Sequence, residues 1–429
     1  MPHDGPANTP LTAEIERRRD NLIALTQDLV RIPTTNPPGR CYRDICDYLD
    51  ARLTASGFAT QMIRAHGTPG DGDKYPRWNI IARREGSAHG DCVHFNSHTD
   101  VVEVGHGWTT DPFGAEIKDG RIYGRGTCDM KGGLATSIVA AEAYLAIYPD
   151  FKGAIEISGT ADEETGGYGG VAYLAEQGFF SPEKVQHVII PEPLNKDRIC
   201  LGHRGVWWAE IETRGRIAHG SMPFLGDSAI RHMGAVLQEI ETYLYPLLAG
   251  KRTAMPVVPE GARQSTLNIN AIHGGEPEPE PDFTGFPAAC VADRCRITID
   301  RRFLIEENID EVKAEVAGML DKIKVSRPNF EYEIRDLWQV TPTMTDRDAP
   351  VVRSVANAIE KVLARQPDYV VSPGTYDQKH IDRIGRLKNC IAYGPGILDL
   401  AHQPDEWIGI DDMVDSAKVM ALTLVELLE

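Results

Sequence analysis

Ser97-His98-Thr99-Asp100 is the stretch from which the fold and the chemistry of this 429-residue chain can be worked out. Four later stretches also place a possible metal ligand beside a turn or chain break: Thr127-Cys128-Asp129-Met130-Lys131-Gly132-Gly133, Asp162-Glu163-Glu164, Pro191-Glu192-Pro193 and Ala401-His402-Gln403-Pro404-Asp405-Glu406. Together they supply imidazoles and carboxylates, a donor set that suits zinc, or a neighbour such as cobalt or manganese. Two such ions about 3.5–4 Å apart can generate a hydroxide and stabilise a developing oxyanion. The sequence therefore predicts a hydrolase that depends on two divalent metal ions.

The surrounding sequence alternates between amphipathic stretches and short apolar runs. The spacing predicts helices over residues 12–32, 42–53 and 132–148, and strands over residues 78–82, 92–95, 154–158 and 188–190. This alternation is typical of an α/β domain whose mostly parallel sheet is buried between helices on both faces. His98, Glu163, Glu164 and Glu192 each follow a predicted strand, and open α/β sheets bind ligands just beyond the carboxyl ends of their strands.

The pattern changes near residue 206. Strands are predicted over residues 206–213, 267–272 and 295–303, with helices over 228–244 and 306–323. We interpret residues 206–328 as an inserted two-layer α+β domain. Residues 1–205 and 329–429 then form the two parts of the catalytic domain. The Glu-Pro repeat of residues 276–281 is predicted to be a stiff, extended surface loop.

Composition excludes several classes of partner. Lys plus Arg is 45 and Asp plus Glu is 63, so the formal charge is −18, which argues against binding nucleic acid or an anionic membrane surface. The N-terminal residues lack the pattern of a secretory signal, and no apolar run approaches the roughly 18 residues of a membrane helix. The eight cysteines are scattered without a C-x-x-C pair, which favours reduced thiols in a cytoplasm.

The five stretches, in this order between His98 and His402, resemble the dizinc amidohydrolase family of acetylornithine deacetylase, succinyl-diaminopimelate desuccinylase, aminoacylase and bacterial glutamate carboxypeptidase. The resemblance covers nearly the whole chain. Any one stretch alone would be a weak signal, whereas the occurrence of all five in order argues against a chance match. The resemblance implies two zinc ions and an inserted domain that many members use for dimerisation, so we expect a homodimer.

The resemblance also implies a role for each ligand. Asp129 would bridge the two ions and be followed by a cis peptide bond; otherwise it would be an ordinary helix N-cap. His98 and Glu192 match the terminal ligands of the first ion, and Glu164 and His402 match those of the second. Without the family pattern, these four would be interpreted as a capping histidine, two surface acids and a loop histidine.

Two acids are expected to support this ligand set. Asp100 matches the family acid that accepts a hydrogen bond from the ligand imidazole and sets its tautomer. Glu163 matches the general base, which takes a proton from the bridging water and returns it to the leaving amine. Cys128 also stands beside a ligand, but adjacent residues on an extended turn point apart, so we do not expect it to bind metal.

Further matches concern the substrate. His219, in Ile217-Ala218-His219-Gly220-Ser221-Met222-Pro223, resembles the histidine that reaches a neighbouring subunit's active site and donates to the tetrahedral oxyanion. Arg302 resembles an arginine that binds a substrate carboxylate, although Arg301 competes for that role. Thr375 and Gly396 lie in stretches that resemble substrate-pocket loops.

Three features depart from the family pattern or lack a role. An asparagine expected before a proline is missing from residues 281–287, which leaves one oxyanion or substrate contact open. Tyr376 replaces a smaller residue and is expected to narrow or reshape the pocket. His203-Arg204-Gly205 resembles a stretch of the deacylase branch, but the sequence assigns it no function.

The leading hypothesis is an amidohydrolase that removes the acyl group from an N-acylated amino acid or related amine through a metal-bridging hydroxide. The alternative is a dipeptidase or carboxypeptidase with the same mechanism. A binding protein that kept the fold but lost the chemistry is disfavoured, because Glu163 and all five ligand positions are present.

Overall fold

The computed structural model describes residues 9–255, 257–275 and 289–429. The chain forms two compact units: unit 1 comprises Met1–Gly202, Met344–Val370 and Tyr376–Glu429, and unit 2 comprises His203–Thr343 and Val371–Thr375. The expectations for the Glu-Pro repeat and for the missing asparagine fall outside the described residues. The predicted insert of residues 206–328 lies within unit 2. Unit 2 extends beyond it because its last sheet strand continues as far as Val340.

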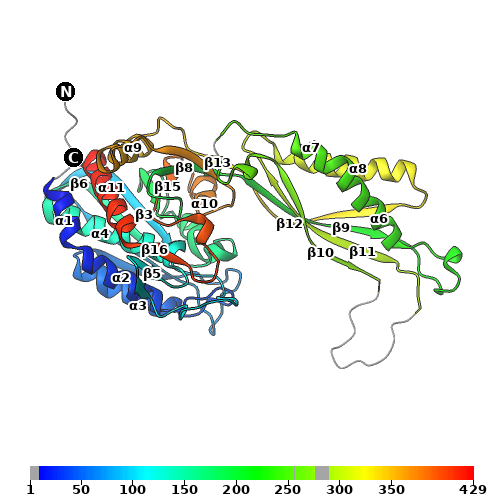
Figure 1. Cartoon of the computed structure of the whole chain (residues 1–429), viewed down its shortest axis with the longest axis horizontal. Coiled ribbons are helices and arrows are strands. Elements are labelled where there is room, and N and C mark those ends of the chain that lie inside the picture. Colours follow the sequence, from blue (N-terminus) through cyan, green and yellow to red (C-terminus); the bar gives the residue numbers. More distant parts are fainter. Residues whose placement is uncertain (1–8, 256, 276–288) are drawn as a thin grey trace. The chain divides into compact units, whose positions relative to one another are not determined.

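A nine-stranded mixed sheet organises unit 1 (Figure 1). Its strands are β1 (Ala59–Arg64), β2 (Trp78–Glu85), β3 (Ala88–His98), β6 (Lys152–Thr160), β7 (His187–Ile190), β8 (Arg198–His203), β13 (Thr343–Met344), β14 (Asp368–Ser372) and β15 (Cys390–Ala392). The order is β1-β2-β6-β3-β7-β15-β8-β13, with β14 paired to β8. The central strands β6, β3, β7 and β15 run parallel, as predicted. The predicted strand at residues 78–82 instead belongs to β2, which is antiparallel to β6.

Helices cover this sheet on both faces. All residues of β6 from Gly153 to Thr160 are buried, which requires cover on each side of the strand. The helices are α1 (Pro10–Arg17), α2 (Arg19–Arg31), α3 (Tyr42–Ala55), α4 (Gly132–Ile147), α5 (Tyr173–Glu176), α9 (Pro350–Leu363), α10 (Gln378–Arg383) and α11 (Ile410–Leu428). A three-stranded sheet of β4 (Glu116–Lys118), β5 (Arg121–Tyr123) and β16 (Trp407–Gly409) completes the unit.

The N-terminal helical segment differs from the prediction. The single helix expected over residues 12–32 is two helices, α1 and α2, which meet at Arg18. The backbone of Arg18 leaves helical geometry, with φ −92° and ψ 6°, while its guanidinium binds Glu14 and Glu142. Ile15 and Leu22 are buried on either side of the break. Apolar spacing alone gave no sign of the break, because no proline or glycine stands there.

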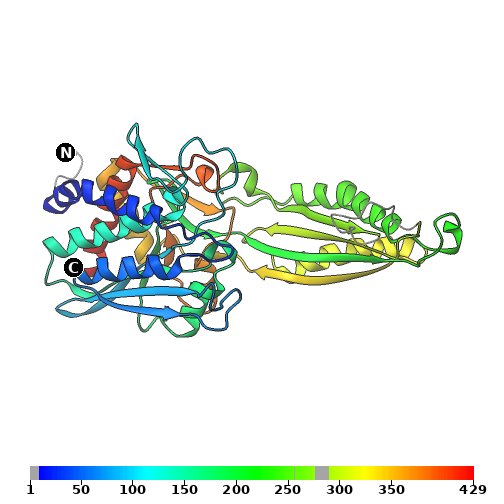
Figure 2. The same cartoon turned by 90° about the horizontal axis from the view of Figure 1, so that it is seen from below.

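Unit 2 is a two-layer structure (Figure 2). Its antiparallel sheet has the order β10-β11-β9-β12, formed by β9 (Gly205–Arg214), β10 (Thr266–Gly274), β11 (Arg294–Phe303) and β12 (Glu331–Val340). The helices are α6 (Ala229–Glu239), α7 (Tyr245–Ala249) and α8 (Ile309–Ser326), with a π-helical turn at Ile240–Leu244 joining the first two. Apolar residues from these helices and from one sheet face form a common core that includes Trp207, Val236 and Leu320.

Within the ranges that the structure describes, no helix combines the length and the apolar character needed to cross a membrane.

Candidate metal centre

In unit 1, strand ends and the segments that follow strands carry four of the five predicted ligands. His98 is the last residue of β3, and Glu164 lies in a 3-10 turn, Glu163–Thr165, just after β6. Glu192 follows β7. Asp129 lies in the segment Thr127–Lys131 that leads into α4, and the Asp129–Met130 peptide bond is cis, as expected.

The carboxylate of Asp129 lies between the two ligand imidazoles. Its Oδ1 is 3.0 Å from Nε2 of His98, and its Oδ2 is 3.4 Å from Nε2 of His402. Nε2 of His402 is also 3.1 Å from the Glu164 carboxylate. Ligand atoms of His98, Asp129 and Glu164 all lie within 4.8 Å of one another. Each oxygen of one carboxylate therefore faces a different imidazole, an arrangement suited to a bridge between two cations.

The electrostatics of this cluster also fit cations. Burial raises the pKa of Glu164 to about 7, with Asp129 adding to the effect and His402 opposing it. Burial and the Asp129 charge raise the pKa of Glu192 well above its usual range. Asp129 and Glu164 raise the pKa of His402 to about 10. Several acids thus compete for the positive charge of two imidazoles. Divalent cations would neutralise the negative charge that the imidazoles leave unbalanced.

The Asp100 side chain faces His98 and also has a role that was not predicted. Nδ1 of His98 lies 3.0 Å from the main-chain oxygen of Asp100, whereas the nearer carboxylate oxygen is 3.6 Å away, beyond hydrogen-bond distance. The carboxylate instead accepts the backbone N–H groups of Glu163 and Glu164, each at 3.2 Å. The Asp100 side chain therefore holds the glutamate turn, and its predicted hydrogen bond with the His98 imidazole stays a prediction.

Glu163 and Glu164 point to different partners, as their adjacency predicted. Glu164 faces His402, whereas Oε1 of Glu163 accepts from Nζ of Lys379 at 2.9 Å. Lys379, in α10, is buried. Sequence reasoning overlooked this lysine. Its place two residues after the predicted pocket loop was the only available signal.

Glu406 is another residue for which the sequence predicted no role. It is buried and accepts from the backbone N–H groups of Cys128 at 2.8 Å and Asp129 at 3.2 Å. Arg125 donates to its other oxygen at 2.6 Å. The Cys128 thiol faces Ile397, so it turns away from the ligand set as expected. Glu406 was visible in the sequence beside His402, but nothing local revealed its distant partners.

The remaining predicted site residues in unit 1 pack closely around the ligand turns. A Cβ on Gly396 would lie 2.7 Å from the main-chain oxygen of Cys128, so only glycine lets the two loops approach. Tyr376 is buried, and its hydroxyl donates to Gln378; its effect on the pocket stays a prediction. The sequence could not distinguish these orientations.

Unit 2 carries His219, Arg302 and Thr375. His219 is exposed, and its Nδ1 accepts from the backbone N–H of Ser221 at 3.2 Å. Arg302 is paired with Asp300 at 2.6 Å. Arg301 is fully buried against Glu307, so it cannot compete with Arg302 for a substrate. Thr375 is half-buried.

The His203-Arg204-Gly205 stretch has a structural explanation. Arg204 is buried in unit 2 and donates to the main-chain oxygens of Pro373, Ala262 and Gln264 at 3.0–3.1 Å. Burial, with the charge of Arg302 adding to it, lowers the pKa of Arg204 to about 10. Arg204 thus ties three separate backbone segments of unit 2 together.

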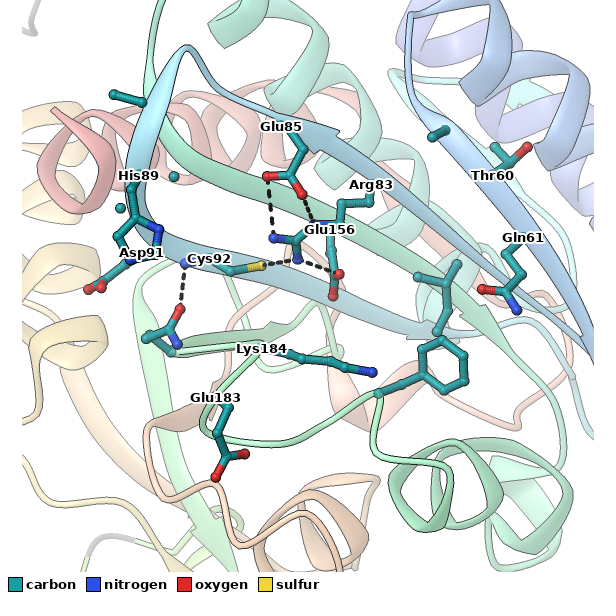
Figure 3. Close-up of a pocket in the computed structure, with 17 residues that line it drawn as sticks. Thr60, Gln61, Arg83, Glu85, His89, Asp91, Cys92, Glu156, Glu183 and Lys184 are labelled. Carbon is teal, nitrogen blue, oxygen red and sulfur yellow. Dashed lines mark hydrogen bonds and ion pairs between the residues drawn. The ribbon is translucent and has the colours of Figure 1, made fainter.

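A cavity of about 650 Å³ in unit 1 is lined by none of the predicted site residues. Arg83 crosses it and pairs with Glu85 and Glu156 at 2.6 and 2.7 Å (Figure 3). Among the residues that the structure describes, the group of side chains able to hold a metal ion lies elsewhere, at His98, Asp129 and Glu164.

Comparison with known proteins agrees with this geometry. The model of peptidase family M20/M25/M40 matches residues 94–426. A succinyl-diaminopimelate desuccinylase from Marinobacter nauticus is 27% identical over 414 residues, covering 95% of this chain and 98% of its own. Human carnosine dipeptidase 1 has a similar structure, with a TM-score of 0.74, 19% identity and coverage of 98% and 99%. The Bacillus subtilis YXEP protein, described as a dinuclear metal binding peptidase, has a TM-score of 0.67, 14% identity and coverage of 96% and 99%.

Metal titration tests the bridging arrangement. We expect two equivalents of divalent cation per chain, and we expect Asp129→Ala to weaken binding at both positions because each oxygen of Asp129 faces a different imidazole. Asp73→Ala, which changes a fully exposed acid of unit 1, is the matched control and should keep both equivalents. Elemental analysis of the metal-loaded proteins measures the outcome, and full retention of both ions by the Asp129 variant would contradict the bridge.

Proposed function

The chain belongs to peptidase family M20/M25/M40 and is a hydrolase of amide C–N bonds, and we propose that it removes the acyl group from N-acylated amino acids or related amines. One observation carries the chemistry: the partly buried carboxylate of Asp129 faces two imidazoles, while the carboxylate of Glu163 faces Lys379 instead. The similarity to two proteins named succinyl-diaminopimelate desuccinylase supports acylated amino acids, and not peptides, as the substrates of this chain. The alternative, a dipeptidase, is supported by the likeness in fold to carnosine dipeptidase 1.

We propose that Asp129 bridges two metal ions, with His98 and Glu192 on the first and Glu164 and His402 on the second. Imidazole and carboxylate donors favour zinc, with cobalt or manganese as substitutes. When bound, the ions would activate water and polarise the amide carbonyl. Asp100 and Glu406 direct the ligands by holding the backbone on which they stand.

We propose that Glu163 is the general base. It is next to a ligand, yet its carboxylate faces Lys379 instead of an imidazole. In the proposed reaction it takes a proton from the attacking water and delivers it to the nitrogen of the leaving amine. Charge on the carbonyl oxygen would be met by a hydrogen-bond donor, for which His219 is suited. Because Nδ1 of His219 accepts from Ser221, its neutral form carries the proton on Nε2.

We propose that Arg302 binds a substrate carboxylate, and that Thr375 and Gly396 line the substrate pocket. Arg302 remains 24% exposed beside Asp300, so an incoming carboxylate would compete with that acid. We also propose a cytoplasmic location. The support is that all eight cysteines are free thiols, as is typical of a reducing compartment.

Assembly into a homodimer through unit 2 is supported by an apolar surface around His219. Four large side chains on the segment that contains it are strongly exposed: Ile217 60%, Met222 41%, Phe224 77% and Leu225 54%. A contiguous exposed apolar patch of this kind is typical of an interaction site. We propose that this surface pairs with its copy, so that His219 of one subunit serves the metal centre of the other.

A substrate panel tests the reaction. We expect metal-loaded protein to cleave N-succinyl or N-acetyl amino acids with a higher kcat/KM than dipeptides, because acylated amines match the desuccinylase relatives. Release of the free amine is measured for both classes, with and without a chelator. A higher kcat/KM for dipeptides would replace the deacylase by the peptidase alternative.

Replacement of Glu163 tests the general base. Glu163→Gln should retain two metal ions and lose about 100- to 10,000-fold in kcat, the usual contribution of a general base. Glu183→Gln, which changes an exposed acid of the same unit, should leave kcat unchanged. The measurements are turnover and metal content, and a kcat close to that of the native protein would remove Glu163 from the mechanism.

Subunit complementation tests the shared site. Inactive His219→Ala and inactive Glu163→Gln proteins, mixed under conditions of subunit exchange, should recover about one quarter of native activity. Roughly half of the dimers would be hybrids, and two-fold pairing gives each hybrid one complete site of two. No recovery after verified exchange would contradict action across the interface, and a monomer in sedimentation would contradict the dimer.

A further inference from the structure

We propose that Lys379 is a positioning residue for Glu163: its ammonium group holds one carboxylate oxygen, keeps Glu163 from joining the metal ligands, and leaves the other oxygen for proton transfer. The inference rests on the role of Glu163 in the proposed function. The ligand set alone does not explain why Glu164 would bind metal and Glu163 would not. Glu163 and Glu164 are neighbours of the same chemical type, and only one of them is to bind metal.

The contact between the two side chains is direct and enclosed. Nζ of Lys379 lies 2.9 Å from Oε1 of Glu163, and the two side chains are 1% and 11% exposed. A lysine buried this deeply needs a compensating charge. Burial acts to lower its pKa, but Glu163, Asp377 and Glu192 outweigh that effect and raise it. Its ion-pair partner is the carboxylate of Glu163.

The helix that carries Lys379 is anchored by buried polar contacts. The side-chain amide of Gln378 donates to the main-chain oxygens of Leu201 and Cys390, at 3.2 and 2.8 Å. Asn96, on the central strand β3, donates to Asp377 at 3.1 Å. Asn96 in turn accepts from Ser158 on β6 at 2.8 Å. These contacts tie the start of α10 to the same strands that deliver His98 and the glutamate turn.

The glutamate turn is held from two sides. Asp100 accepts the backbone N–H groups of Glu163 and Glu164, which sets the path of the main chain. On the other side, Nε2 of His380 lies 2.7 Å from the main-chain oxygen of Gly166, next to the Lys379 contact. With the backbone so constrained, the direction of the Glu163 side chain depends on which partner it finds. Lys379 provides that partner away from the imidazoles.

The test is a double-mutant cycle with a control for the loss of a buried lysine. Lys379→Met should lower kcat by about 10- to 100-fold, the range found when a group that orients a metal site is removed, with KM changed less than twofold. In the Glu163→Gln background the same substitution should change kcat less than twofold, because a residue that acts through Glu163 has nothing left to position. Lys379→Arg should recover part of the loss.

Lys418→Met is the matched control. Lys418, on α11, is another poorly exposed lysine of unit 1, and it is paired with Glu16 at 2.5 Å. Replacing Lys418 should leave kcat within twofold of the native value. The visible spectrum of the cobalt-substituted protein gives a readout independent of turnover. Bands of Lys379→Met should weaken, because a released Glu163 raises the coordination number, whereas those of Lys418→Met should not change.

The outcomes separate this inference from the proposed function. An equal loss of kcat in both backgrounds, or no loss in either, would overturn the positioning role while leaving Glu163 as the base. An unchanged cobalt spectrum in Lys379→Met would overturn the claim that the lysine keeps Glu163 from the ions. A fully active Glu163→Gln protein would instead contradict the proposed function itself. If Lys379→Met does not fold, Lys379→Gln, which keeps a hydrogen-bond donor without the charge, replaces it in the cycle.

Discussion

The contact of the Asp129 carboxylate with two imidazoles is the interaction on which the rest of the site depends. Each oxygen of Asp129 faces a different histidine, in a region where burial and neighbouring acids raise the pKa values of Glu164 and Glu192. Such a concentration of buried acid is unfavourable without positive charge. The two imidazoles offset part of it, and the donor set that remains suits divalent cations.

Much of the precision of this arrangement comes from contacts with the backbone. Glu406 accepts the N–H groups of Cys128 and Asp129, and Asp100 accepts those of Glu163 and Glu164. Close approach adds to this control, since a Cβ on Gly133 would lie 2.0 Å from the main-chain oxygen of Pro191. The segments that carry the candidate ligands are thereby held by acids and glycines outside the candidate ligand set.

The two units divide the work in the proposed mechanism. Unit 1 contains the five candidate metal ligands and Glu163 on a sheet covered on both faces, which suits a site that must not move. Unit 2 contains His219 within a segment of exposed apolar side chains that connects β9 to α6. The proposed dimer would bury that apolar surface. It would also explain why a residue suited to hydrogen-bond donation stands so far from the ligands in sequence.

The sequence by itself determined the fold class, pointed to the five stretches that carry candidate ligands, and predicted that two adjacent glutamates face different partners, because each depends on local patterns. Apolar runs mark the strands that end at His98 and shortly before Glu164 and Glu192, and adjacency sends neighbouring side chains apart. It did not reveal the break at Arg18, the direction of β2 or the inward orientation of Tyr376. It also missed Lys379 and the contact of the Asp100 carboxylate with the glutamate turn. Only the tertiary structure decided these points, because each partner lies far away in the chain and local spacing carries no information about which distant groups will meet.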